Sequence, residues 1–310
     1  MISSNNRILR IAIFFGAVFC CSLSNAQTHF ARLSNDWDVA GTWSTTGTGG
    51  PSCGCVPGAG DNVLIDGYDV DIDAGTGNVT VADLKITNAR GSDVRLRIQG
   101  GVTLTVTNDF EIESTSSGND AELRVEDASI MDVDGDFLAD QDDGDDLFVE
   151  ADDASTLNID GDATFDQDGG DDMLLTINDN SGSTATITID GDLTWEHDGG
   201  DDGHIRVDDA SSDLNVGGNL SVSLNSGDND DFLFNLDNGT VDITGDLLLT
   251  RASDCDEIDL DMESCILTCD DLTITSSGPE FTDGAVRFFI DGDSEVNCAT
   301  FTSTFSGADD

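Results

Sequence analysis

The chain has very few basic residues, with 11 Lys and Arg against 64 Asp and Glu in 310 residues, and a formal net charge of −53. Lys85 is its single lysine. A protein this negative repels nucleic-acid phosphates and anionic membranes and attracts cations. The composition therefore predicts no nucleic-acid partner. The hydrophobic fraction of 37% is still sufficient for a buried core, which argues against a disordered chain.

Beyond residue 26 the chain lacks any apolar run long enough to span a bilayer, so we expect no transmembrane span. The apolar run IAIFFGAVFCCSL follows Arg7 and Arg10 and ends in a small-x-small cleavage pattern. Residues 1–26 are therefore predicted to be a secretory signal peptide, and the protein to be secreted or displayed on the outer cell surface. An uncleaved anchor is the alternative, but the run is short for a span. Lipidation at Cys20 or Cys21 is a second alternative, but the preceding residues are not the small ones expected there.

The chain also has only three prolines, and short β-like runs recur along it with a small residue after each. This residue recurs about every 27 residues, at Asn108, Gly135, Gly161, Gly191, Gly218, Gly245, Cys269 and Cys298. A fixed period of this length with tolerated insertions indicates a solenoid.

Each period contains three short runs in which Val, Ile, Leu, Phe and Thr alternate with polar residues, for example 157–159, 163–165 and 173–177. Alternation is the strand period, and none of the runs is long enough for a helix. The sequence therefore predicts an all-β, right-handed parallel β-helix with three strands and about 27 residues per coil. We expect an N-terminal cap and first strands at 27–80, and coils over 81–310 that are truncated or continue beyond the C-terminus.

The head of the mature chain has a distinct pattern, with Trp37, Gly-Thr-Trp43 and Pro57-Gly-Ala-Gly-Asp61-Asn-Val before an alternating strand. Over about residues 35–86 this segment resembles the opening of secreted bacterial β-helix proteins, especially Bacteroidetes surface proteins, and is similar to the start of G8-type domains. The resemblance implies a cap whose tryptophans cover the first coil, and a surface or adhesion role. A cap is also expected on physical grounds, because the first coil would otherwise expose unpaired backbone N–H and C=O groups.

Acidic loops containing glycine precede several of the apolar runs, namely DQDDGDD (140–146), DQDGGDD (166–172), EHDGGDD (196–202) and SGDNDD (226–231). If equivalent loops stack, their carboxylates lie roughly 4.8 Å apart along one edge and repel one another. Ca²⁺ would reverse that repulsion, because it accepts six to eight oxygens in forgiving geometry. The predicted calcium ligands are Asp142, Asp143, Asp145, Asp146, Asp166, Asp168, Asp171, Asp172, Asp198, Asp201, Asp202, Asp228, Asp230 and Asp231.

The alternative to calcium sites is a solvated acidic edge with diffuse counterions. Neither the EF-hand spacing nor the GGxGxD nonapeptide of calcium rolls occurs in the chain. His197 and His204 flank one acidic loop and are either metal ligands or ordinary loop residues.

Six cysteines remain after the signal peptide, and export favours disulfides among them. Cys269 and Cys298 occupy the same position in successive coils and are predicted to form a disulfide that joins those coils. Cys255 and Cys265 are the expected second pair. The Cys53-Gly-Cys55 segment either closes on itself or binds metal. A zinc site of the four later cysteines lacks paired CxxC spacing.

The carboxylates are a regular part of the repeat and do not stand out as a catalytic pair would, so we expect no catalysis. The sequence predicts an exported structural or adhesive surface module, stabilised by Ca²⁺, with an extracellular polysaccharide or cell-surface ligand as its partner. A carbohydrate-binding or carbohydrate-active β-helix, with a lyase-like or hydrolase-like activity, is the alternative. The basic residues of such a site would be Lys85 and the arginines of the early coils, mostly Arg90, Arg95, Arg97 and Arg124. Ice binding would need an aligned Thr-x-Thr array, and TATITI at 184–189 is isolated.

Overall fold

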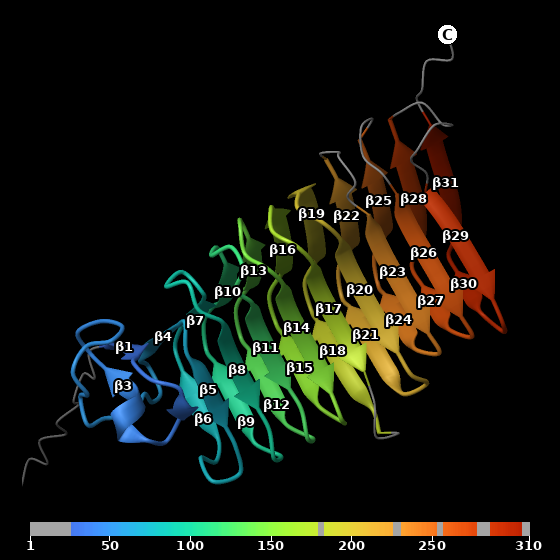
Figure 1. Cartoon of the computed structure of the whole chain (residues 1–310). Helices are drawn as coiled ribbons and strands as arrows, with labels where there is room; N and C mark the ends of the chain where they lie inside the picture. Colours follow the sequence, from blue (N-terminus) through green and yellow to red (C-terminus); the bar gives the residue numbers. More distant parts are fainter. Residues whose placement is uncertain (1–25, 179–182, 226–230, 253–256, 278–285, 306–310) are drawn as a thin grey trace, which may run out of the picture.

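In the computed structural model, the described residues are 26–178, 183–225, 231–252, 257–277 and 286–305. They form three long sheets that run side by side along an elongated molecule (Figure 1). The predicted signal peptide, apart from Ala26, lies outside these ranges, as do Asp228, Asp230 and Cys255. Among the described residues there is no helix long and apolar enough to cross a membrane.

Sheet A has 12 strands in the order β3 (Trp43–Ser44), β1 (Thr28–Ala31), β4 (Asn62–Asp66), β7 (Leu84–Thr87), β10 (Phe110–Ser114), β13 (Phe137–Gln141), β16 (Ala163–Asp168), β19 (Leu193–Gly199), β22 (Leu220–Leu224), β25 (Leu247–Arg251), β28 (Asp271–Ser276) and β31 (Thr300–Phe305). Sheet B has 10 strands, β2 (Asn35–Asp36), β5 (Asp69–Ile72), β8 (Val94–Ile98), β11 (Ala121–Val125), β14 (Leu147–Asp152), β17 (Met173–Asn178), β20 (Gly203–Asp208), β23 (Phe232–Asp237), β26 (Ile258–Glu263) and β29 (Val286–Asp291). Sheet C has nine strands, in chain order β6 (Val79–Val81), β9 (Thr103–Val106), β12 (Ile130–Val133), β15 (Thr156–Ile159), β18 (Ala185–Ile189), β21 (Ser212–Val216), β24 (Thr240–Ile243), β27 (Ile266–Thr268) and β30 (Glu295–Asn297).

Each coil contributes one strand to each sheet, and every strand from β4 onward pairs in parallel with the equivalent strand of the next coil. Thus β13 pairs with β16, β14 with β17 and β15 with β18. The predicted all-β parallel β-helix, with about 27 residues and three strands per coil, is confirmed.

The core follows from strict alternation of side chains. Along β14 the pattern is buried, half-buried, buried, because successive side chains point to opposite faces. Stacking of the coils then brings buried side chains into contact along the axis. The clearest run is aromatic, with ring centroids 4.7 to 5.8 Å apart through Phe110, Phe137, Phe165, Trp195 and Phe232. Two of these contacts, Phe110 with Phe137 and Phe165 with Trp195, join register partners, whereas Phe137 pairs with Ala163 and Phe232 comes from sheet B.

The corner between sheets C and A explains the Gly-Asp repeat. The N–H of each repeat glycine donates to the carbonyl of its equivalent in the preceding coil, as from Gly161 to Gly135 at 3.0 Å. The following aspartate accepts the backbone N–H of the next coil, as Asp136 does from Asp162 at 3.0 Å. A Cβ on Gly161 would lie 2.3 Å from Asp136 Oδ1 and 2.6 Å from the Gly135 carbonyl oxygen, so glycine allows the close approach of the backbones at this coil.

Three short strands and one turn of 3-10 helix, η1 (Ala40–Thr42), lie at the N-terminal ends of sheets A and B (Figure 1). Strand β1 pairs antiparallel with β3 and parallel with β4. Trp37 and Trp43 are almost wholly buried there, edge to face at 4.7 Å, and Trp43 Nε1 donates to the Trp37 carbonyl at 2.7 Å. Both tryptophans belong to the buried core at the N-terminal end of the described chain.

Candidate functional site: an acidic edge

The acidic segments begin in the last residues of β13, β16 and β19 and continue into the corner where sheet A turns into sheet B. They stack through their own backbones. The Gly169 N–H donates to the Gln141 carbonyl at 3.1 Å, and Asp171 N–H donates to the Asp145 carbonyl at 3.1 Å. The expected edge of stacked acidic loops is therefore present between 140 and 202. The fourth loop lies almost entirely outside the described residues.

The last aspartate of each loop has a structural contact that the sequence analysis did not foresee. The Asp146 N–H donates to Asp120 Oδ1 at 3.3 Å, and Asp172 N–H donates to Asp146 Oδ1 at 3.1 Å. The same contact links Asp231 to Asp202 at 3.3 Å. Four predicted calcium ligands, Asp146, Asp172, Asp202 and Asp231, therefore belong to a ladder in which each carboxylate accepts a backbone N–H of the next coil.

The other predicted ligands carry the repulsion along the edge. The hydrogen bond and charge of Asp171 raise the pKa of Asp145 to about 6. Burial, with the charges of Asp142 and Asp166, raises the pKa of Asp140 to about 6. The exposed carboxylates of the loops are Asp142, Asp143, Asp168, Asp171, Glu196, Asp198 and Asp201. The raised pKa values of Asp140 and Asp145 mean that the folded protein holds the negative charges of these two carboxylates at a cost in free energy.

The donor set along this edge fits a hard cation, because it consists of oxygens. Beneath the loops lie the fully buried side chains of Gln141 and Gln167, whose Nε2 atoms donate to the carbonyls of Asp145 and Asp171. Their Oε1 atoms are buried and have no hydrogen-bond partner. Carboxylate, amide and carbonyl oxygens are the ligands that Ca²⁺ prefers. If calcium binds, Asp145 and Asp171 would supply charge, and it would remove the repulsion between coils.

The two histidines of the third loop have different surroundings. His197 is wholly buried, in register with Gln167, and burial lowers its pKa to about 4. His204 is half-buried, and its Nε2 lies 3.9 Å from Asp202 Oδ2. One ligand atom each from Asp172, Asp202 and His204 lie within 4.8 Å of one another. His204 is therefore the histidine placed where a metal ion could bind.

A second acidic hollow lies on sheet C, and the sequence analysis missed it. Its volume is about 370 Å³, and its lining includes Asp132, Asp134, Asp160 and Asp190. Asn158 Nδ2 donates to Asp132 Oδ1 at 2.8 Å across the coils. The signal was present in the sequence as the first aspartate of the repeated Asp-Gly-Asp, at 134–136, 160–162 and 190–192.

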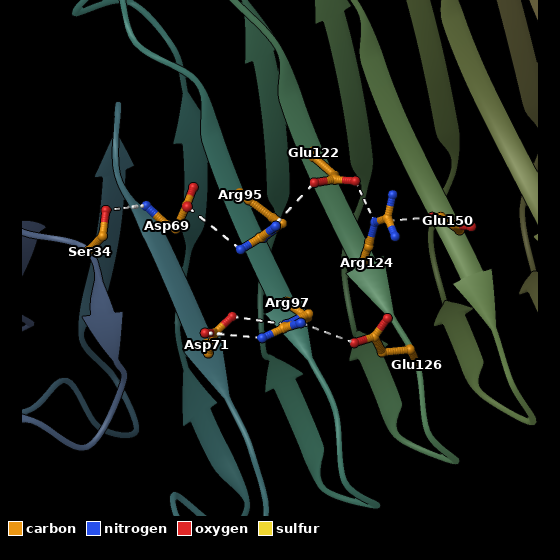
Figure 2. Close-up of polar contacts among 9 residues, drawn as sticks. All are labelled: Ser34, Asp69, Asp71, Arg95, Arg97, Glu122, Arg124, Glu126 and Glu150. Carbon is orange, nitrogen blue, oxygen red and sulfur yellow. Dashed lines mark hydrogen bonds and ion pairs between the residues drawn. The ribbon is translucent and has the colours of Figure 1, made fainter.

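The arginines of the early coils are paired with carboxylates on the outer face of sheet B (Figure 2). Arg95 lies 3.6 Å from Asp69 and 4.0 Å from Glu122. Arg97 lies 3.1 Å from Asp71 and 3.7 Å from Glu126. Arg124 contacts Glu122 and lies 3.2 Å from Glu150. Arg90 instead stacks over the Tyr68 ring at 5.7 Å.

The cysteines only partly follow the predictions. Cys53 and Cys55 are joined, so the Cys-Gly-Cys segment closes on itself. Cys269 and Cys298 do occupy equivalent positions in successive coils, next to the paired Thr268 and Asn297, but their thiols are free, as is that of Cys265. The predicted bond between Cys269 and Cys298 is therefore not formed in this structure. Burial and the neighbouring Cys298 raise the pKa of the Cys269 thiol to about 11, which disfavours the thiolate needed for oxidation. The partner proposed for Cys265 lies outside the described residues.

Comparison of the chain with protein-family models, with curated proteins and with solved structures gives no match.

Proposed function

We propose that this protein is an exported structural or adhesive β-solenoid whose acidic edge binds Ca²⁺. The observation that carries the proposal is the stack of acidic loops over buried, unpartnered amide oxygens, with the pKa values of Asp140 and Asp145 raised to about 6. The edge is an array of oxygen donors. The charged groups described around Asp145 are all carboxylates, those of Asp171, Asp120 and Asp146.

Calcium would act as a switch for stiffness. Two carboxylates one coil apart repel by on the order of 1 kcal/mol in water, and by more where water is thinned. The repulsion is repeated along the edge, so it opposes the stacking of successive coils. A cation between loops changes that repulsion into attraction. The rod would then be more stable in a calcium-rich extracellular medium than inside the cell that made it.

The proposed structural or adhesive role is supported by the regularity of the coils and by the predicted signal peptide at residues 1–26. A parallel β-helix holds its surface side chains at fixed spacings along a rigid axis, which suits the display of a repeated surface. Localisation outside the cell, on a surface or in the medium, is part of the proposal. The partner would be an extracellular polysaccharide or a cell-surface ligand.

Thermal unfolding of the chain from Gln27 tests the calcium step. We expect a saturable rise of the midpoint with Ca²⁺ over an EDTA control at fixed ionic strength, and a much smaller rise with Mg²⁺. A rise matched by Mg²⁺ or by salt alone would reduce the edge to a solvated surface and contradict the calcium step.

A matched pair of variants locates the effect. Asp145→Asn with Asp171→Asn removes two charges from adjacent loops. We expect it to raise the midpoint in EDTA, because repulsion is relieved, and to diminish the calcium increment. Asp127→Asn with Asp153→Asn removes two charges from adjacent coils at the corner between sheets B and C, and should leave the increment unchanged. Both positions have positive φ, which asparagine tolerates.

Carbohydrate binding is the second candidate, and one feature favours it. A hollow of about 240 Å³ on sheet B is lined by Phe148, Leu174, Asn178, Arg206 and other residues, which combine an aromatic ring with polar groups. Binding to a polysaccharide array that is lost in Arg206→Ala and kept in Arg90→Ala would support this candidate. Depolymerisation of a polysaccharide by the purified chain would instead favour an enzyme.

A further inference from the structure

The second cluster of reactive side chains lies at the N-terminal end, far along the sequence from the acidic edge. The Cys53–Cys55 disulfide closes a three-residue segment between β3 and β4. Cys53 is anchored by its backbone, since its N–H donates to the Trp43 carbonyl at 3.0 Å. Gly54 between the cysteines is exposed with a φ of +65°, and a Cβ there would meet nothing within 4 Å. Both sulfur-bearing residues are partly exposed. A thiol from solution can therefore approach the bond.

A buried histidine lies against this disulfide. His29 of β1 is only 3% exposed, and its Nδ1 lies 3.6 Å from Cys55 Sγ. Its other nitrogen, Nε2, lies 3.3 Å from Asp61 Oδ2. Aspartate, histidine and cysteine therefore form a line, and the histidine ring joins the carboxylate to the sulfur.

The carboxylate of Asp61 is itself held in place by two backbone N–H groups. Asp61 Oδ2 accepts the Gly58 N–H at 3.1 Å, and Oδ1 accepts the Gln27 N–H at 3.3 Å. An ionised carboxylate only accepts hydrogen bonds, so it selects the tautomer of His29 with its proton on Nε2. Nδ1 then presents a lone pair to Cys55. A base oriented by a carboxylate and directed at a thiol is the arrangement that activates a nucleophile.

We propose that Cys53 and Cys55 form a redox-active pair that exchanges with external disulfides and thiols, with His29 as the proton acceptor of Cys55 and Asp61 as a positioning residue. In the dithiol form, the Cys55 thiol passes its proton to His29 Nδ1. The Cys55 thiolate attacks one sulfur of a substrate disulfide, forms a mixed disulfide and releases one substrate thiolate. Cys53 then attacks Cys55 Sγ, restores the Cys53–Cys55 bond and releases the second thiolate. The protons of His29 and Cys53 pass to the two substrate thiolates.

The balance is one substrate disulfide reduced to two thiols and one protein dithiol oxidised to the bond seen in the structure. The reverse reaction, in which two external thiols are oxidised, uses the same atoms. The imidazolium and thiolate stabilise each other as an ion pair, which increases the thiolate fraction near neutral pH. This site is separate from the acidic edge and does not depend on calcium binding.

Site-resolved alkylation of the reduced chain from Gln27 tests the proposal, and Cys298 serves as a partly exposed reference thiol in the same molecule. Peptide mass spectrometry gives the rate at each cysteine after a pulse of iodoacetamide. At about pH 6 we expect Cys55 to react about tenfold or more faster than Cys298, because the Cys55 thiol has the His29 ring beside it as a proton acceptor. His29→Gln should remove that advantage without changing the Cys298 rate. Equal rates at Cys55 and Cys298 in the parent chain would overturn the proposal.

Two further measurements keep the test independent of folding defects. Asp61→Asn keeps the ring but not its carboxylate, and should move the acid limb of the Cys55 pH profile to higher pH while far-UV circular dichroism stays unchanged. Equilibration of the parent chain with glutathione buffers should give both forms of the pair within the accessible range of ratios. A bond that stays fully oxidised in excess reduced glutathione is structural and contradicts the proposal. Stoichiometric Co²⁺ bound by thiolates in the reduced chain, with no exchange, would assign the cluster to metal binding and also overturn it.

Discussion

Stacking of equivalent residues in successive coils brings opposite charges together in one region of the molecule and like charges together in another. On the outer face of sheet B, Arg95, Arg97 and Arg124 each lie beside carboxylates from neighbouring coils (Figure 2). At the corner between sheets A and B, carboxylates stack on carboxylates, and the pKa values of Asp140 and Asp145 rise to about 6. Parallel in-register pairing repeats each position one coil later, so it multiplies attraction in one region and repulsion in the other.

On the outer face of sheet B, basic and acidic residues do not alternate strictly from one coil to the next. Arg97 and Arg124 are direct partners in the register, yet each has carboxylates beside it. Hydrogen bonds to Asp71 and to Glu122 raise the pKa values of Arg97 and Arg124, although burial opposes the rise. Each of the three arginines on this face therefore has carboxylates beside it. The acidic corner lacks such basic neighbours in the described loops, which is why a cation is the natural complement there.

The comparison depends on the register, and breaking the register should have the largest effect. In Gly191→Ala the new Cβ would lie 2.2 Å from Asp162 Oδ1 and 2.6 Å from the Gly161 carbonyl. We expect a loss of about 2 to 3 kcal/mol in the free energy of unfolding, because the clash involves backbone that is fixed by its own ladder. Denaturant titration measures it. Gly58→Ala, where a Cβ would meet nothing within 4 Å, is the control and should change little. Equal stability of the two variants would show that the corner relaxes freely.

Reversing the charge at Arg124 should create, on the outer face of sheet B, repulsion between carboxylates of the kind that we infer at the acidic corner. Arg124→Glu places three glutamates together, with Glu122 and Glu150. We expect a loss of about 1 to 2 kcal/mol, discounted because the Arg124 side chain is 42% exposed, and a loss that shrinks in high salt. Arg124→Met keeps the apolar stem and removes only the charge, so it should lose less. If both variants lose the same amount at every salt concentration, packing of the stem and not charge explains the effect.

Much of the fold was readable from the sequence because its signals are periodic. Alternation in β14 and β17 and the Gly-Asp corners at Gly135 and Gly161 recur every coil, so each repeat confirms the previous one. The structure adds what periodicity does not encode, namely which atom meets which. The aspartates that end the acidic loops looked equivalent to the others, but Asp146 and Asp172 accept backbone N–H groups from the next coil.

Contacts between distant segments were the least predictable. His29 lies beside Cys55 and Asp61 because β1 pairs with β4. The sequence around position 29 contains no pattern that predicts this pairing. For Cys269 and Cys298 the positions were predictable, but the disulfide was not. Equivalent positions in successive coils were correctly identified, yet the two thiols remain free in the structure. Register places two residues near each other, whereas bond formation also depends on side-chain orientation and on the thiolate fraction.

The smallest effect should be the pH dependence of stability without calcium. Asp140 and Asp145 have folded-state pKa values near 6, raised from 3.8, so between these pH values the folded state binds more protons than the unfolded state. Their stabilising contribution is fully present below about pH 4 and is lost as pH rises through about 6. His197 opposes this trend, since its pKa is lowered from 6.5 to about 4 and its contribution is lost as pH falls through the same range. Because several carboxylates oppose one histidine, we expect the unfolding midpoint in EDTA to fall from about pH 4 to pH 7.

Asp140→Asn should flatten the fall of the midpoint, and saturating Ca²⁺ should flatten it further, because bound metal competes with the protons for the same oxygens. A midpoint that rises over this range in EDTA would show that the carboxylates of the corner are not under the repulsion on which the comparison with the arginine face depends.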